Sequence, residues 1–290
     1  MHIAPALRRA SVAVVALSTL ALAGCSSSTE AETSATPTDA ATAGAEAALE
    51  TFTEGKLTIA TGEPAYEPWV IGDAPESGEG FEAAVAYAVA EELGFAADDV
   101  VWVRTTFDSA IAPGAKDWDF NIQQFSITDE RRQAVDFSSP YYVTTQAVVS
   151  VEGNDYAEAG SIADLEGAAI GVAVGTTSYD VTAEALGEDN IQVFNSVADV
   201  VAALNSGQID AFVTDLPGAF YSAYVEVEGG TIVGQFASSE GGDEFGLVLP
   251  KDSPLTDAVT GAVDTLTENG TLETLETEWL SAAVDVPVLN

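Results

Sequence analysis

The sequence is poor in the side chains on which much enzyme and metal chemistry depends. Among its 290 residues it has one histidine, His2, and one cysteine, Cys25. An intrachain disulfide is therefore excluded, and most transition-metal sites and nucleophile–histidine pairs are disfavoured. The D-x-D-x-D-G pattern of a calcium loop is also missing. We expect no metal and no cofactor.

Positive charge is scarce as well. Only 8 lysines and arginines stand against 47 aspartates and glutamates, which gives a formal net charge of −39. Such a chain repels nucleic acid and anionic lipid surfaces, so we expect no nucleic-acid partner. Apolar residues make up 47% of the chain, enough for a folded core. The length predicts about two domains.

Residues 1–24 have the pattern of a secretory signal peptide. Arg8 and Arg9 give a positive leader, and the apolar run at 10–23 is too short to span a membrane. The run ends in Leu-Ala-Gly-Cys at 22–25, which resembles the bacterial lipobox. The resemblance implies a lipid on Cys25 and a protein anchored on the extracytoplasmic face of the cell membrane. The alternative is an unmodified cysteine after an ordinary signal peptide.

Residues 25–54 are mostly Ala, Thr, Ser and Glu, with almost no apolar residue larger than alanine before Leu49. This composition predicts a lipidated, flexible tether that is not part of the folded body. Cleavage before Cys25 removes the only histidine, so acid–base chemistry would have to use carboxylates or tyrosines. That argues against a Ser-His-Asp hydrolase, and we expect no enzyme activity.

Beyond the tether, short apolar strands alternate with helical patterns. The pattern predicts strands at 57–60, 100–103, 170–174, 209–213 and 245–249. It predicts helices at 81–93 and 196–204, and a helix pair between 254 and 280 that is split at Asn269-Gly270. Alternation of this kind indicates an α/β protein with mainly parallel sheets. Two β-like segments, 148–151 and 244–247, are candidates for a two-strand crossing between lobes.

Arg131 is the most informative of the few cations. Thr128 is suited to cap a helix in which Arg131 takes the third position. Arginine is unfavourable there for the helix dipole, but a helix N-terminus with an arginine fork binds anions. The alternative is a pairing of Arg131 with a local acid such as Asp136 or Glu130.

Two further candidates follow predicted strands. The turn at 175–178, which includes Thr176 and Thr177, offers backbone N–H groups and hydroxyls to an anion, although it can also be a plain helix cap. Asp215 lies just past the strand at 209–213, at the edge where open α/β sheets bind ligands. It can hold an ammonium group, or it can be a solvated turn residue.

Aromatic residues supply the last candidates. Tyr66, Trp69 and Phe107 lie in predicted loops, where aromatic rings can enclose a ligand. An isolated aromatic residue is more often part of the core, and Trp69 best fits that role.

Several motifs in order resemble the family 3 extracellular solute-binding proteins, the polar amino-acid receptors of ATP-binding-cassette (ABC) importers. Residues 126–142, with SITDER followed by VDFSSPYY, are similar to the family pattern T-I-T-x-E-R…V-D-F-S-x-P-Y. Looser matches are Tyr-Glu-Pro-Trp at 66–69, Gly-Phe-Glu at 80–82, Gly-Thr-Thr at 175–177 and Gly-Gln-Ile-Asp-Ala at 207–211. The resemblance covers about 57–280.

The resemblance implies a two-lobed fold of the periplasmic-binding-protein type II, with two mainly parallel sheets joined by a two-strand hinge. The first lobe would comprise 55–149 and 244–290, and the second lobe 150–243. The lobes would close around the ligand.

The resemblance also assigns ligand-binding roles. Arg131, helped by Ser126 and by Thr177 in the Thr176-Thr177 turn, would bind the ligand carboxylate. Asp215 and the backbone at Gln124 would bind the ammonium group. Tyr66 and Phe107 would flank the ligand side chain, and Glu63 would contact its tip. Gln123-Gln124 departs from the small residues usual in the family, which predicts a narrowed or redirected pocket wall.

The resulting prediction is a monomeric, lipid-anchored protein that captures a polar amino acid and delivers it to an ABC permease. One alternative is an enzyme of the dehydratase or lyase type on the same fold, because fold does not fix function. Another is an amino-acid sensor for a membrane partner.

Overall fold

The computed structural model describes residues 49–237, 242–280 and 286–290. The predicted signal peptide, Cys25 and most of the predicted tether lie outside the described residues. The end of that tether belongs to the folded body. Leu49 packs against the hydrophobic core, and the N–H of Phe52 donates to Asp119 Oδ1 at 2.6 Å. The prediction that residues up to 54 are a free tether is therefore wrong for this stretch.

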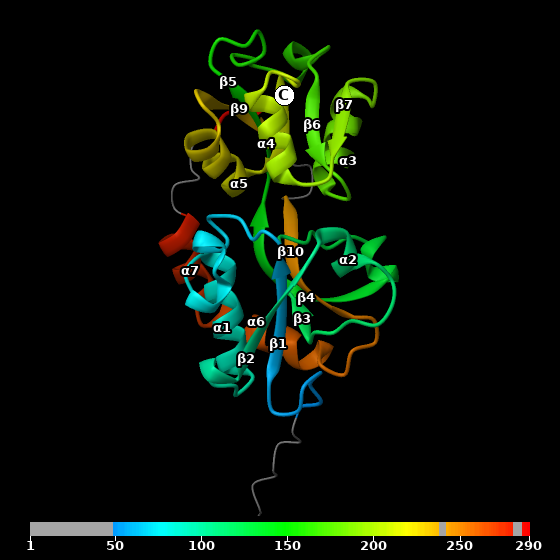
Figure 1. Ribbon diagram of the computed structural model, residues 1–290, viewed down its shortest axis with the longest axis vertical. Coiled ribbons are helices and arrows are strands. Elements are labelled where there is room, and N and C mark those ends of the chain that lie inside the picture. Colours follow the sequence, from blue (N-terminus) through cyan, green and yellow to red (C-terminus); the bar gives the residue numbers. More distant parts are fainter. Residues whose placement is uncertain (1–48, 238–241, 281–285) are drawn as a thin grey trace, which may run out of the picture. The chain divides into compact units, whose positions relative to one another are not determined.

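The first sheet has five strands in the order β2-β1-β3-β10-β4 (Figure 1). They are β1 (Leu57–Gly62), β2 (Val100–Thr105), β3 (Phe120–Asn121), β4 (Val135–Thr144) and β10 (Asp243–Pro250). Helices α1 (Phe81–Glu92), α6 (Thr256–Glu268) and α7 (Thr271–Leu280) share one core cluster with this sheet. The short α2 (Phe107–Ile111) belongs to a second cluster. This sheet and its helices form the first lobe.

The second sheet has six strands in the order β11-β9-β5-β8-β6-β7. They are β5 (Gln146–Val151), β6 (Ile170–Ala173), β7 (Ile191–Phe194), β8 (Ala211–Asp215), β9 (Gly230–Phe236) and β11 (Val288–Leu289). Its helices are α3 (Thr177–Leu186), α4 (Val197–Asn205), α5 (Leu216–Tyr221) and the π-helix η6 (Ser222–Glu226). Together they form the second lobe.

Short 3₁₀ helices lie in the connections. They are η1 (Ile71–Asp73), η2 (Pro75–Ser77), η3 (Ala97–Asp99), η4 (Arg131–Gln133) and η5 (Ile162–Leu165). Of these, η4 carries the arginine that the sequence singles out.

The α/β prediction is confirmed, and both sheets are mixed. The β1, β2 and β3 strands are parallel, as are β6, β7 and β8. In contrast, β10 runs antiparallel to β3 and β4, and β5 runs antiparallel to β8 and β9. The antiparallel pairs arise because β4–β5 and β9–β10 carry the chain from one sheet to the other and back.

The crossings do not lie where the β-like segments predict them. The chain changes sheets at Thr145, between β4 and β5, and it returns between β9 and β10. Segments 148–151 and 244–247 instead lie inside β5 and β10, because their apolar side chains are buried in the sheets. Residues 146–149 thus belong to the second sheet. So do Val288–Leu289, which pair with β9, whereas the prediction placed both segments in the first lobe.

Local geometry explains where two helices begin. Ser196 caps α4 by accepting the N–H of Asp199 at 3.2 Å. Before α1, Gly80 has φ +104°, and a Cβ there would lie 2.5 Å from the carbonyl oxygen of Trp69, so only glycine fits.

Trp69 is a core residue, as its sequence context predicts. It is 2% exposed, and its ring packs against Phe81 and Phe245.

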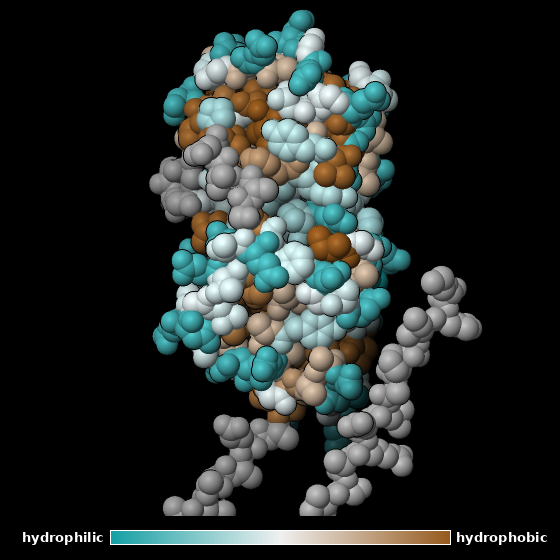
Figure 2. All heavy atoms as spheres, turned by 90° about the vertical axis from the view of Figure 1, so that its left-hand side faces the viewer, coloured by the Kyte–Doolittle hydropathy of each residue, from teal (hydrophilic) through white to brown (hydrophobic). Residues whose placement is uncertain are grey.

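The described helices are all too short or too polar to cross a lipid bilayer. Figure 2 shows one face of the molecule, on which hydrophilic and hydrophobic residues are interspersed. The exposed large apolar side chains include Tyr224 and Val225, both in η6 and both 66% exposed.

Candidate functional site

A cavity of about 150 Å³ lies between the two lobes, where segments following β1, β6, β7 and β8 meet. The cavity is smaller than the range of about 300–1,000 Å³ typical of sites for drug-sized ligands. All the ligand-binding residues predicted from the sequence line it: Glu63, Tyr66, Phe107, Gln124, Ser126, Arg131, Thr176, Thr177 and Asp215. The geometry therefore suits a solute of small size.

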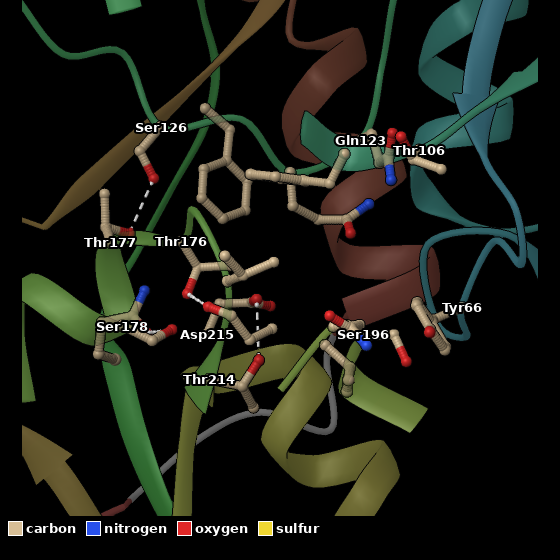
Figure 3. A pocket seen from close by; sticks show the side chains of 18 of the residues that line it. Tyr66, Thr106, Gln123, Ser126, Thr176, Thr177, Ser178, Ser196, Thr214 and Asp215 are labelled. Atoms are coloured by element: carbon tan, nitrogen blue, oxygen red, sulfur yellow. Dashed lines mark hydrogen bonds between the residues drawn. The ribbon is translucent and has the colours of Figure 1, made fainter. Parts of the chain in front are cut away.

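The cavity has two chemically different ends (Figure 3). Ser126 and Thr177 face each other at one end, with their hydroxyl oxygens 3.2 Å apart. Tyr66, Gln123 and Thr106 lie at the other end. A ligand that fills the cavity would extend from the hydroxyl pair toward the aromatic and amide groups.

Arg131 bridges the two lobes at the hydroxyl end. Its Nη1 donates to the carbonyl of Ser126 at 2.7 Å, and its Nη2 donates to the carbonyl of Gly175 at 2.8 Å. The guanidinium also lies 5.5 Å from the ring of Phe107, which stacks on Phe125. Two carbonyls use two of its five N–H groups, so others remain to bind an anion.

The local structure around Arg131 is simpler than the predicted helix. The hydroxyl of Thr128 accepts the N–H of Arg131 at 3.2 Å, as a cap would. However, the turn that follows is the three-residue η4, so no long helix directs its dipole at the site. The alternative pairing with Asp136 is also excluded, because Asp136 bonds Lys251 at 3.0 Å. Within the described residues, Arg131 takes part in no ion pair.

The turn after β6 brings the second lobe against the first. Gly175 has φ +73°, and a Cβ there would lie 2.7 Å from Asp108 Oδ1. The hydroxyl of Thr176 donates to the carbonyl of Ala173 at 2.8 Å and so stabilises the turn. Helix α3 begins at Thr177 without a side-chain cap, which leaves N–H groups of its first turn available to an anion.

Asp215 supplies negative charge in the middle of the cavity. Its carboxylate caps α5 by accepting the N–H of Gly218 at 3.3 Å, and the hydroxyl of Thr214 lies 3.4 Å away (Figure 3). Burial is the main cause that raises the pKa of Asp215 to about 6; the charge of Asp243 acts in the same direction, and the hydrogen bonds to Gly218 and Thr214 act in the opposite one. A ligand ammonium group would favour the ionised form. The carboxylate lines the cavity, so Asp215 is not merely a solvated turn residue.

The two glutamines that depart from the family pattern do different things. Gln124, at φ +51°, donates its backbone N–H to Glu82 Oε1 at 2.7 Å, and its side-chain amide also donates to Glu82. Its side chain is thus bound to a fully buried glutamate. Gln123 Oε1 is buried and has no hydrogen-bond partner among the described residues. Gln123 therefore offers an acceptor at the cavity wall.

Glu82 fixes the position of Gln124 through two hydrogen bonds. The sequence alone could not predict this contact. Besides Gln124, the hydroxyl of Tyr141 donates to Glu82. Burial raises the pKa of Glu82 to about 7, although these hydrogen bonds act in the opposite direction. The only sequence signal for Glu82 is its place in the Gly-Phe-Glu motif before α1.

Three contacts across the cavity show that the lobes are close together in this structure. They are Arg131 to Gly175, Ser126 to Thr177, and the hydroxyl of Tyr66, which accepts the N–H of Ala198 at 3.4 Å. Glu63 lies in the rim and is exposed. Among the residues that the structure describes, no cluster of three or more His, Cys, Asp and Glu side chains is arranged to hold a metal ion.

Residues 57–282 match the family model of the bacterial extracellular solute-binding proteins, family 3. The chain belongs to this family. The resemblance predicted from the motifs is thereby confirmed, as is the two-lobed fold it implied. The cavity of this solute-binding protein lies between the lobes, at the edges of the two sheets. This is the usual ligand position in open α/β structures.

Individual relatives of this solute-binding protein are named for amino acids. The probable histidine-binding protein of Campylobacter jejuni subsp. jejuni is 32% identical over 199 residues, which are 68% of this chain and 73% of the relative. The solved structure of an ancestral arginine-binding protein bound to arginine has a TM-score of 0.64 and 31% identity. It aligns over 78% of this chain and 98% of its own.

One similar structure connects the fold with an enzyme. It is an ancestral amino acid-binding protein described as a precursor of cyclohexadienyl dehydratase, with a TM-score of 0.64 and 30% identity. It aligns over 78% of this chain and 95% of its own. The fold of this solute-binding protein therefore does not by itself decide between binding and catalysis.

Proposed function

We propose that this solute-binding protein captures a polar amino acid between its two lobes and delivers it to an ABC permease. The observation that carries the proposal is the placement of opposite charges in one small cavity. Arg131 and the hydroxyls of Ser126 and Thr177 lie at one end, and Asp215 lies beside them. This arrangement is complementary to the carboxylate and ammonium groups of a zwitterion.

In this proposal Arg131, Ser126 and Thr177 bind the ligand carboxylate, and the Thr176 turn presents N–H groups to it. Asp215 and the backbone at Gln124 bind the ammonium group. Tyr66 and Phe107 flank the ligand side chain, and Glu63 contacts its tip. Support comes from the common cavity that all these residues line.

A cationic ligand side chain fits the charges best. Among the described residues, the cavity lining contains the two carboxylates of Glu63 and Asp215 and one cation, Arg131. After the zwitterion pairs with Arg131 and Asp215, the carboxylate of Glu63 is left to favour a positive group. The relatives named for histidine and arginine agree with this choice.

The anchor is the second part of the proposal. Cleavage before Cys25 and lipidation of its thiol would attach the protein to the extracytoplasmic face of the cell membrane as a monomer. Because a tether near the permease raises the effective concentration, delivery would be favoured. The lipobox-like sequence at 22–25 supports this part.

The proposal is tested by thermal unfolding of the purified protein with each of the twenty amino acids. A ligand at 100 times its Kd stabilises the folded state by about 2.7 kcal/mol. In a protein of this size that raises Tm by about 2–4 °C. We expect a shift with one or a few amino acids, lost in Arg131→Ala and kept in Arg132→Ala. No shift with any amino acid would overturn the proposal.

Catalysis is the competing proposal, and the ancestral dehydratase precursor is the observation that favours it. We propose binding without turnover, so the bound amino acid should be recovered unchanged. Incubation with the amino acid that raises Tm, followed by NMR of the solution, tests this. A new product that is absent with the Asp215→Asn variant would favour the enzyme.

A further inference from the structure

A carboxylate of the chain itself lies at the anion end of the cavity. Asp243 is the first residue of β10, the strand that returns the chain to the first sheet. Its Oδ2 accepts the hydroxyl of Thr177 at 2.7 Å and lies 3.3 Å from the hydroxyl of Ser126. These are the two hydroxyls that face each other in Figure 3.

A hydroxyl has one proton to donate. When Thr177 donates it to Asp243, the same proton is not available to a ligand carboxylate. Ser126 is subject to the same limit, since its oxygen lies within reach of both Thr177 and Asp243. The hydroxyls of Ser126 and Thr177 are therefore both within hydrogen-bond distance of the Asp243 carboxylate, at the end of the cavity where a ligand carboxylate would bind.

The charge of Asp243 also acts on Arg131 and Asp215 in the cavity. Burial lowers the pKa of Arg131, and among the nearby acids Asp243 opposes that effect most. The same charge contributes to the raised pKa of Asp215. Asp243 thus partly neutralises Arg131 and would repel a second carboxylate beside it.

The position of Asp243 is fixed from a third side. Gln146, the first residue of β5, donates its side-chain amide to Asp243 Oδ2 at 2.8 Å. The other atom of that amide, Oε1, accepts the hydroxyl of Ser178 at 2.7 Å. Both crossing strands and the first turn of α3 therefore hold the carboxylate in place, so its contact with the hydroxyl pair is part of the packed structure.

We propose that Asp243 competes with the ligand carboxylate for the hydroxyls of Ser126 and Thr177, weakens the attraction of Arg131 through its charge, and thereby limits the affinity of the site. The inference rests on the proposed function, because it requires a carboxylate ligand at this end of the cavity. In this inference, a residue outside the cavity lining weakens the binding of the ligand. Weaker binding of this kind would ease release of the solute.

The Asp243→Asn variant separates this role from a structural one. The asparagine has nearly the same shape, and its carbonyl oxygen can still accept the amide of Gln146. The hydroxyls of Ser126 and Thr177 meet the same atom as Gln146, so in the variant they face a neutral amide oxygen, which they leave more readily for a ligand carboxylate. Because one negative charge is also removed beside Arg131, we expect about tenfold tighter binding of the amino acid.

The experiment is isothermal titration of the purified protein with two probes. One is the amino acid that raises Tm most, and the other is its carboxamide, which has no carboxylate. We expect Asp243→Asn to tighten the amino acid about tenfold and to change the carboxamide less than twofold. Glu244→Gln, which removes an exposed charge one residue along β10, is the matched control and should leave both unchanged.

Each contrary result has a distinct meaning. Unchanged or weaker binding of the amino acid by Asp243→Asn overturns the inference and leaves the proposed function standing. Equal tightening of the carboxamide also overturns it, because the effect would not depend on the carboxylate. Wild-type protein that binds no amino acid overturns the proposed function and the inference together. Asp243→Ser serves as a second variant, with tighter binding again expected, if the asparagine variant does not fold.

Discussion

The guanidinium of Arg131 donates to the carbonyl of Gly175 at 2.8 Å, from the first lobe to the second. This contact places Arg131, the cationic side chain of the cavity, where the two lobes touch. An incoming carboxylate would therefore bind where the lobes already meet. Ligand binding and closure of the lobes are expected to be coupled through this pair.

Gly175→Ala should weaken ligand binding by about tenfold. Alanine at φ +73° is strained, and its Cβ would lie 2.7 Å from Asp108 Oδ1, so relief of the backbone strain would shift the carbonyl that Arg131 binds and would displace the Asp108 side chain. Gly187→Ala is the matched control, because Gly187 has φ +78° with open space around it. Titration with the amino acid checks the difference. Equal losses in the two variants would show that the close approach is unimportant.

Asp215→Asn should weaken binding by about thirtyfold or more at pH 7.5, because the ligand ammonium loses its buried charged partner. In the wild type, protonation of Asp215 below its pKa of about 6 should weaken binding by up to about tenfold per pH unit. The variant should lose this dependence. Titrations between pH 5 and 8 test it, with the exposed Asp189→Asn as control. A dependence retained by Asp215→Asn would assign it to another group.

Glu82 should make the folded protein less stable as pH rises. Its pKa is raised from about 4.5 to about 7, so the folded chain holds this proton more tightly than the unfolded chain. The resulting stabilisation is complete below about pH 4.5 and is lost as pH rises through about 7, by up to about 3 kcal/mol. Glu82→Gln should flatten this part of the curve in urea unfolding at pH 5 to 8. The exposed Glu79→Gln should keep the slope, and a slope retained by Glu82→Gln would contradict the assignment.

Cys25→Ser should release the protein from the membrane. Without a thiol at residue 25 no lipid can be attached, and the proposed anchor is lost. Fractionation of cells that express each form should place the wild type with the membranes and the variant in the soluble fraction. Ser26→Ala is the neighbouring control and should remain with the membranes. Membrane attachment of Cys25→Ser would disprove the proposed anchor.

The sequence could predict what short continuous patterns encode. The stretch from Ser126 to Arg131 combines a cap, a cation and hydroxyls within six residues; Ser126 and Arg131 do meet at the cavity, and Thr128 caps the turn that carries Arg131. The α/β alternation likewise predicted the strands β1, β2, β6, β8 and β10 and the helices α1, α4, α6 and α7. Such features depend on local spacing, so they can be recognised without knowing the fold.

Features that depend on distant contacts could not be predicted. The contact of Gln124 with Glu82 joins residues 42 positions apart, and that of Asp243 with Thr177 joins residues 66 apart. Among 47 acids, no local feature distinguishes Asp243, and Glu82 has only its place in the Gly-Phe-Glu motif, which does not reveal its partner. The crossing at Thr145 was also misplaced, because an apolar β-like run identifies a buried strand and not the polar residue that joins two strands.

The most direct measurement is a crystal structure of the protein with the amino acid that raises its Tm most. The ligand carboxylate should lie within hydrogen-bond distance of Arg131, Ser126 and Thr177, and its ammonium group should contact Asp215. Asp243 should have moved away from the hydroxyl pair or lost its bond to Thr177. A ligand bound outside this cavity, or with its carboxylate away from Arg131, would contradict the zwitterion site.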